Sequence, residues 1–168
     1  MRSMKKEQCS TCEHLAIVTR GNYEFGEMGL PVVLQRIQIV KCSHCGTTEP
    51  IIPNLNDLMH TVALAVICKP CTLDGEEIKF LRRYVGKTAT EFSTLLHLDN
   101  TSLSKMENEE RKAGPRTDKL IRFLTVSLSP ELIDKMDRLV KQLPTMRDCE
   151  KKNAEIQIDP QTMQCQYA

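Results

Sequence analysis

The chain has 168 residues and a net charge of +1, with 40% hydrophobic residues, 4% aromatic residues and no tryptophan. This near-neutral charge gives no general attraction to nucleic acid or anionic membranes, and no stretch approaches the ~18 uninterrupted apolar residues of a membrane span. So few aromatic side chains are not enough to fill one large core. A chain of this length is better explained as a small metal-bound module beside a small helical module.

The start of the chain has no apolar segment of the kind that a secretory signal contains. Eight cysteines in a chain without an export signal therefore predict reduced thiols and a cytoplasmic protein. Under reducing conditions, paired cysteines are better explained as metal ligands than as disulfides.

Two such pairs stand near the N-terminus, Cys9 with Cys12 and Cys42 with Cys45. A spacing of two residues lets one tight turn aim both sulfurs at one ion, and four thiolates complete a tetrahedron around zinc. Because a closed site leaves no position for water, the ion is expected to be structural rather than catalytic. Iron in a rubredoxin-like site uses the same four ligands.

Residues 1–52 are therefore predicted to form a small zinc-ribbon-like β domain, with a β-branched strand at 32–40 leading into the second cysteine pair. Residues 53–72 follow as a linker helix, since apolar residues recur there at helical spacing and Lys69-Pro70 ends the pattern. The two parts together predict an α+β protein.

Residues 73–144 show helical periodicity throughout and predict an all-α domain of about five helices. Thr88 is the expected cap of the second helix, Asp99 or Asn100 caps the third, and Gly114-Pro115 opens the fourth. The last helix carries one apolar stripe, a candidate dimer contact unless it packs onto its own bundle: Leu132, Ile133, Met136, Leu139, Val140 and Leu143. Residues 145–168 are polar and aperiodic and are predicted to be a flexible tail.

A third cysteine pair, Cys68 with Cys71, lies between helices rather than in the βαβ context of a thioredoxin-like motif. A second metal would need two more ligands from poorly spaced residues such as Cys149 and Cys165, so the pair is interpreted as incidental reduced thiols. His14 and His44 lie beside or within the first two pairs and are interpreted as surface residues or as neighbours of the ligands.

The second and third helices of the all-α domain form a candidate helix-turn-helix. In the third helix Leu103 and Met106 can face the core, while four polar residues can face a DNA major groove: Asn100, Thr101, Ser104 and Lys105. The alternative is a plain helical bundle with an ordinary solvated face.

Positive charge gathers in residues 111–122, which hold five basic residues and one acid, Asp118. Such a patch beside a recognition helix can contact phosphates, as can the start of the second helix at Thr88. The basic residues are Arg111, Lys112, Arg116, Lys119 and Arg122. Glu107, Glu109 and Glu110 are expected to face away from DNA or to form intramolecular pairs.

An Xre/Cro-type helix-turn-helix resembles three segments of this chain, 75–86, 88–96 and 101–108. Together with the two CxxC pairs that precede them, they make the chain similar to YgiT-type zinc-finger/helix-turn-helix proteins. That family includes MqsA-type antitoxins. The resemblance covers roughly residues 9–128. It implies a structural zinc, a C-terminal domain that binds operator DNA as a dimer and, in antitoxin members, an N-terminal domain that holds a toxin.

Carried over by position, the resemblance puts base contacts on Thr101 and Lys105, with a lysine where the family commonly has arginine. Ala89 replaces a glutamine that usually contacts the DNA backbone. His97 and Glu109 stand where the family often has glycine, which makes two tight backbone positions costlier.

The predicted function is that of a sequence-specific transcriptional regulator. One form of such a regulator is an antitoxin that represses its own operon. A protein-interaction module that masks a toxin is one alternative, and a rubredoxin-like redox protein or one using the Cys68 and Cys71 pair is another. The sequence contains no paired carboxylates, nucleophile–histidine pattern or phosphate loop, so no enzyme is expected.

Overall fold

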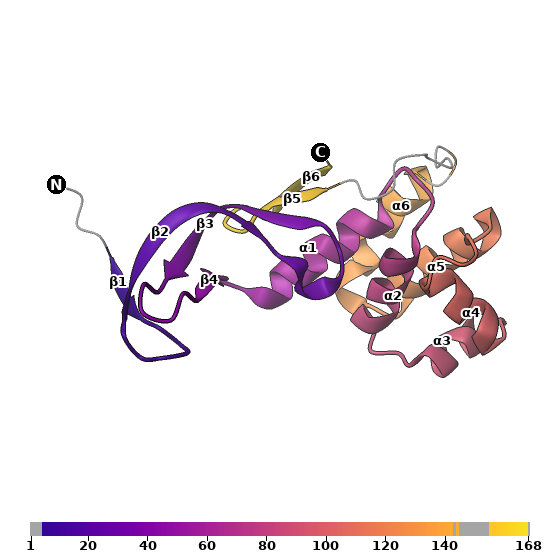
Figure 1. The fold of residues 1–168 in the computed structure, drawn as a ribbon. Helices are drawn as coiled ribbons and strands as arrows, with labels where there is room; N and C mark the ends of the chain where they lie inside the picture. Colours follow the sequence, from indigo (N-terminus) through magenta and orange to yellow (C-terminus); the bar gives the residue numbers. More distant parts are fainter. Residues whose placement is uncertain (1–4, 143, 145–154, 168) are drawn as a thin grey trace.

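The computed structural model describes residues 5–142, 144 and 155–167, and it is an α+β protein with one mixed sheet and several helices. The strands are β1 (Lys6–Gln8), β2 (Leu15–Glu24), β3 (Val32–Lys41), β4 (Thr48–Ile51), β5 (Ile156–Asp159) and β6 (Gln164–Tyr167). The helices are η1 (Gly26–Met28), α1 (Leu55–Ile67), α2 (Gly75–Tyr84), α3 (Ala89–Leu95), α4 (Asn100–Glu107), α5 (Pro115–Ser127), η2 (Pro130–Lys135) and α6 (Met136–Gln142). β1 to β4 lie at one end of the molecule and α2 to α6 at the other, with α1 between them (Figure 1).

The sheet has the order β1-β2-β3-β5-β6, and β4 also pairs with β3. β3 is its central strand because two strands share one of its edges: β4 pairs with 38–41 and β5 pairs with 32–34. The pairing of β3 with β5 is parallel, and the other pairings are antiparallel. The strands of the predicted N-terminal β domain are therefore part of a larger sheet.

A bulge in β3 changes which residues of this strand face the core. Alternate residues are buried up to Leu34, and the alternation resumes out of phase at Ile37. Between them Arg36 has a φ of 54°, and its backbone N–H donates to Asn22 Oδ1 at 3.2 Å. The extra residue lets both halves of a β-branched strand bury their side chains on the same face.

α1 was predicted as a linker, but it is a core helix. Asn54 caps it by accepting a hydrogen bond from the backbone N–H of Asp57, and Leu58, Val62 and Val66 are fully buried. The same contiguous apolar core includes buried residues of the sheet and of α2 to α6. The front and rear halves of the molecule are thus packed together through α1 rather than joined by an exposed connector.

The helices predicted after residue 73 are confirmed as α2 to α5, including Thr88 and Asp99 as caps and Pro115 at the first turn of α5. The last predicted helix differs, because a 3-10 helix precedes α6. Its apolar stripe also divides between two faces. Leu132 and Leu139 are buried, Ile133 and Val140 are exposed, Met136 is half-buried, and Leu143 lies outside the described residues.

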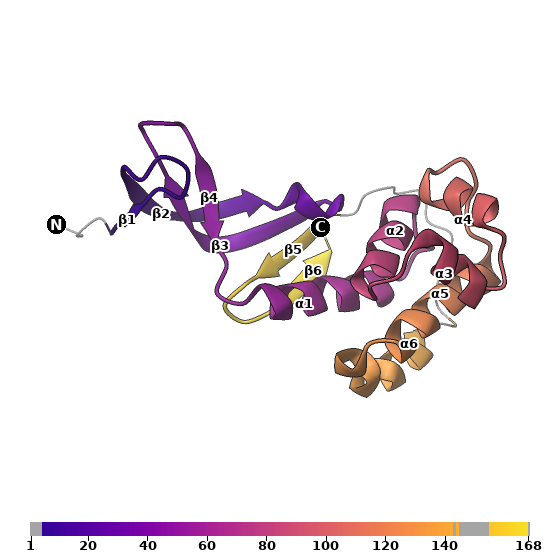
Figure 2. The same ribbon diagram turned by 90° about the horizontal axis from the view of Figure 1, so that it is seen from below.

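The flexible tail predicted for residues 145–168 is wrong for residues 156–167, which form β5 and β6. Ile156 and Ile158 are buried in the core, and the hydroxyl of Tyr167 donates to the backbone carbonyl of Ala65 at 2.6 Å. The hairpin lies between β3 and α1 (Figure 2). Its apolar positions are too few to show a period in the sequence, and residues 145–154 lie outside the described residues.

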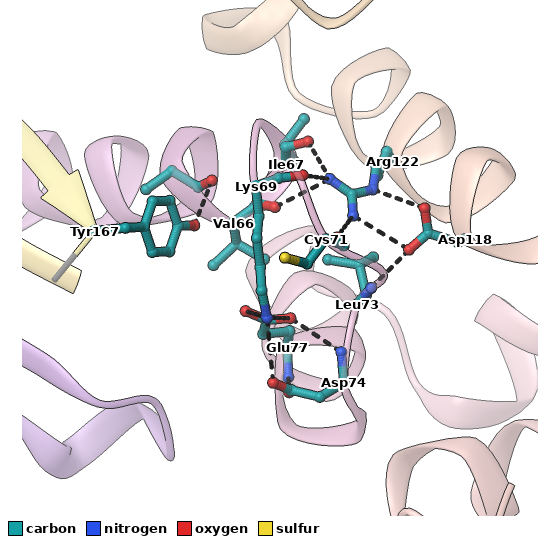
Figure 3. Close-up of polar contacts among 11 residues, drawn as sticks. Val66, Ile67, Lys69, Cys71, Leu73, Asp74, Glu77, Asp118, Arg122 and Tyr167 are labelled. Carbon is teal, nitrogen blue, oxygen red and sulfur yellow. Dashed lines mark hydrogen bonds and ion pairs between the residues drawn. The ribbon is translucent and has the colours of Figure 1, made fainter. Parts of the chain in front are cut away.

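A buried arginine closes the C-terminal end of α1 (Figure 3). Arg122, fully buried on α5, donates to the carbonyls of Ile67 at 2.6 Å, Lys69 at 2.9 Å and Cys71 at 2.6 Å. Its guanidinium also pairs with Asp118, which accepts from the backbone N–H of Leu73 at 2.8 Å. These contacts satisfy the carbonyl groups that a helix end leaves without partners.

A second buried ion pair connects the same loop to α2. Lys69 Nζ lies 2.8 Å from both carboxylate oxygens of Glu77, and one of these oxygens also accepts from the backbone N–H of Asp74. Burial raises the pKa of Glu77 from 4.5 to about 6, although Lys69 opposes this shift. The start of α2 is therefore fixed by charges that are shielded from water.

Within the described part of the chain, no helix combines the length and the apolar character that crossing a membrane requires.

Candidate metal centre and the exposed face of α4

The two cysteine pairs form turns with the same hydrogen-bond pattern. In the first, the N–H of Cys9 donates to the carbonyl of His14, and the N–H of Glu13 donates to the carbonyl of Cys9. In the second, the N–H of Cys42 donates to the carbonyl of Thr47, and the N–H of Gly46 donates to the carbonyl of Cys42. The fourth residue after the first cysteine has a left-handed backbone in both turns, with a φ of 61° in one and 78° in the other.

The sheet brings the two turns together because β2 pairs with β3 so that Ile17 lies opposite Lys41. The four sulfurs lie within 4.8 Å of one another, and the pairs Cys9–Cys45 and Cys12–Cys42 are each 3.6 Å apart. A tetrahedron with metal–sulfur bonds of ~2.3 Å has sulfur–sulfur edges of about 3.8 Å. The arrangement therefore fits one metal ion held by all four cysteines.

The pKa values of two of these thiols are shifted in opposite directions. Hydrogen bonds from the hydroxyl and backbone of Thr47 lower the pKa of Cys45 from 9.0 to about 6. A backbone hydrogen bond at His14 lowers the pKa of Cys12, but desolvation and the other sulfurs outweigh it and raise that pKa to about 12. The Cys45 thiol therefore ionises readily, whereas a positive ion among the sulfurs would favour the thiolate of Cys12.

The third cysteine pair does not join this centre. Cys71 is disulfide-bonded, whereas Cys68 is not part of a disulfide, so the prediction of two reduced thiols is wrong for Cys71. Cys165 is an exposed thiol on β6, and Cys149 lies outside the described residues.

The second candidate site is the pair of helices α3 and α4. Each begins with a side-chain cap: Thr88 accepts from the N–H of Glu91, and Asp99 accepts from the N–H of Ser102. His97, in the connection between the helices, has a φ of 51°. This left-handed residue reverses the chain so that α4 packs against both α3 and α2.

α4 has one buried and one exposed face. Leu103 and Met106 are 0% and 3% exposed and belong to the core. The four residues predicted to face outward are all exposed, and they are Asn100, Thr101, Ser104 and Lys105. Thr88 is exposed as well, although its hydroxyl is engaged with Glu91 in the helix cap.

α4 is held from its C-terminal end by α2. Arg82 donates to both carboxylate oxygens of Glu107, at 2.6 and 2.9 Å, so the predicted intramolecular pairing of Glu107 is confirmed. The start of α2 also lies close to this end of α4. A Cβ atom on Gly75 would stand 2.6 Å from the carbonyl oxygens of Met106 and Glu107.

The basic patch is smaller than the sequence predicted. Arg122 is fully buried against Asp118 and is therefore excluded from any surface contact. This pair also removes the only acid of residues 111–122 from the surface. The remaining four basic residues are exposed, and they are Arg111, Lys112, Arg116 and Lys119.

Two residues that shape the metal centre were overlooked in the sequence. Glu13 occupies the left-handed position that Gly46 fills in the other turn, and aligning the two CxxC pairs residue by residue would have identified it. Thr47, which lies 3.0 Å from the Cys45 sulfur through its hydroxyl oxygen, carries no comparable sequence signal.

Comparison with protein families, with curated proteins and with solved structures found no match to this chain.

Proposed function

We propose that this chain is a sequence-specific DNA-binding transcriptional regulator with one structural zinc ion, built like the YgiT-type zinc-finger/helix-turn-helix proteins that its motifs resemble. The observation that carries the proposal is the exposed polar face of α4, backed by buried Leu103 and Met106. A helix held in this way can enter a major groove, where Thr101 and Lys105 would reach base edges.

The surroundings of α4 support this role. Arg82 neutralises Glu107, so a carboxylate at the end of α4 does not oppose phosphate. The four exposed basic residues of 111–119 follow directly after α4 and supply charge for the DNA backbone. In the proposed function the N-terminal part is a zinc ribbon, α3 and α4 are the helix-turn-helix, and a homodimer reads two half-sites.

An antitoxin that masks a toxin is a second candidate. The observation that favours it is apolar surface on β2, where Leu15 is 70% exposed and Ile17 is 38% exposed. Residues two apart in a strand point to the same face, so these side chains offer neighbouring contacts to a protein partner. Copurification of a small protein that is released by Leu15→Asp would favour this role.

The regulator is tested by binding of the full-length protein to the DNA upstream of its own gene across a salt series. Lys105→Ala should weaken binding at the specific site by about 5- to 150-fold, equivalent to ~1–3 kcal/mol, with little loss on random DNA. Lys6→Ala, an exposed lysine on β1, is the matched control. The proposal fails if the wild type binds upstream and random DNA equally across the salt series.

The ion is identified by metal analysis of the same preparation. One zinc per chain is expected, and Cys9→Ser should lower that content. A red protein that contains iron would instead favour the rubredoxin-like alternative.

A further inference from the structure

Two of the four histidines of this chain stack on each other beside the four-cysteine centre. The rings of His14 and His44 are parallel within 8°, and their centroids are 3.6 Å apart. Both side chains are exposed, one from each of the two cysteine turns. The pairing that brings the sulfurs together therefore also brings together two imidazoles.

These imidazoles form a second group of potential ligands with one of the cysteines. Ring nitrogens of His14 and His44 and the sulfur of Cys12 lie within 4.8 Å of one another. A tetrahedral ion bound by two nitrogens and one sulfur needs separations of about 3.3–3.6 Å. The three atoms are at most 4.8 Å apart, and rotation of the exposed His44 side chain can bring them to these separations while His14 Nδ1 stays on its carbonyl.

The hydrogen bonding of His14 suits a metal ligand. Its Nδ1 lies 2.9 Å from the backbone carbonyl of Cys12, and a carbonyl can only accept a hydrogen bond. Nδ1 therefore carries the proton, and Nε2 keeps its lone pair. Histidines that bind metals commonly have this arrangement, with one ring nitrogen fixed by a carbonyl and the other on the ion.

The charge of the neighbouring centre also favours a second cation. Four thiolates around one divalent ion leave a net charge of about −2 at the surface of the protein. Cys12 is only half-buried, so its sulfur can contact an ion on its outer side as well. A second divalent cation bound there would bring the combined charge of the two sites to about zero.

We propose that Cys12, His14 and His44 bind a second divalent ion of the zinc, cobalt and nickel type, which shares the Cys12 thiolate with the ion of the four-cysteine centre. The proposal rests on occupation of that first centre. Mixed imidazole and thiolate ligands select such ions over magnesium or calcium. Because three protein ligands leave one position to water and both histidines are exposed, the second ion is held more weakly than the first and exchanges.

The test is calorimetric titration of zinc into full-length protein that already carries one equivalent. The wild type should bind one further ion per chain. His14→Ala and His44→Ala should each weaken this second step at least tenfold, since even outer-shell changes cost about that much. His97→Asn changes an exposed histidine in the connection between α3 and α4, two helices that lie at the opposite end of the molecule from β1 to β4, and should leave both steps unchanged (Figure 1).

The two steps separate this proposal from the first metal centre. Retention of one tightly bound ion by both variants, with the second step lost, supports the proposal and shows that the variants fold. No second step in the wild type, or a second step that survives both substitutions, overturns it. A chain that holds no ion at all would instead contradict the four-cysteine centre. Cobalt in the second position should absorb at shorter wavelength than in the first, because nitrogen replaces sulfur.

Discussion

Arg122 and Asp118 form an ion pair one helical turn apart on α5, with Nε and Oδ2 separated by 3.0 Å, and neither residue is more than 3% exposed. Nη1 of Arg122 donates to the backbone carbonyl of Ile67, the last residue of α1, and to that of Lys69 in the loop that follows. One side chain therefore connects α5, the end of the core helix α1 and the loop that leads into α2 (Figure 3).

Arg122→Met should lower the free energy of unfolding by about 3–5 kcal/mol, because it leaves Asp118 as a buried charge without its cation and removes the donor from the carbonyls of Ile67, Lys69 and Cys71. Urea unfolding followed by circular dichroism measures the change. Arg116→Met, at an exposed position of the same helix, should stay within about 0.5 kcal/mol. A loss of equal size in both variants would show that the buried contacts of Arg122 are not its source.

Gly75→Ala should destabilise the protein by about 1–3 kcal/mol, because the new Cβ would meet two backbone carbonyls of α4 at 2.6 Å. Backbone atoms cannot turn away as a flexible side chain can, so α2 and α4 must separate. Thermal unfolding measures the loss. Gly26→Ala, where no atom lies within 4 Å of the added Cβ, is the matched control, and an equal effect there would rule out the steric explanation.

His97→Gly should stabilise the protein by about 0.5–1 kcal/mol. His97 has a φ of 51°, a conformation that costs ~1–2 kcal/mol for residues with a side chain, while glycine loses some of this gain to its more flexible unfolded state. Glu110→Gly, at an exposed position of the loop after α4, has no positive φ to relieve and should not raise the stability. Chemical denaturation of both variants decides the matter.

The stability of the wild type should depend on pH through Glu77. Since the folded protein raises the pKa of Glu77 from 4.5 to about 6, it binds this proton more tightly than the unfolded chain does. The favourable contribution is therefore complete below pH ~4.5 and is lost as the pH rises through ~6. The difference between a pKa of 4.5 and one of about 6 corresponds to about 2 kcal/mol.

This contribution is measured against Glu77→Gln, which does not titrate. Between about pH 4 and pH 7.5 the wild type should lose about 2 kcal/mol of unfolding free energy relative to the variant. Glu76→Gln, a change of the same kind at a half-buried neighbour that pairs with Lys79, controls for the general effect of removing an acid from α2. A constant difference between wild type and Glu77→Gln across this range would contradict the raised pKa.

Much of the candidate site could be predicted because its causes are local. The two CxxC spacings predicted the four-sulfur cluster, and it is confirmed as a group that can hold an ion. The caps at Thr88 and Asp99 were predicted because a short polar side chain satisfies N–H groups only a few residues away. The outward direction of Lys105 followed in the same way from the period of one helix.

Other features depend on partners far along the chain, and the sequence alone could not identify them. Arg122 faces the core because it donates to carbonyls at and just after the end of α1. These carbonyls lie more than 50 residues earlier in the chain. The strand at Ile156 exists because it pairs with Val32 and covers the core, although its own segment has no clear period. Within the described residues, local chemistry thus determined the ligands, the caps and the helix faces, whereas long-range packing decided which charges are buried and where the C-terminal strands belong. The physical reason is that a hydrogen bond to a neighbouring residue is encoded in spacing, while burial depends on segments that only the folded chain brings together.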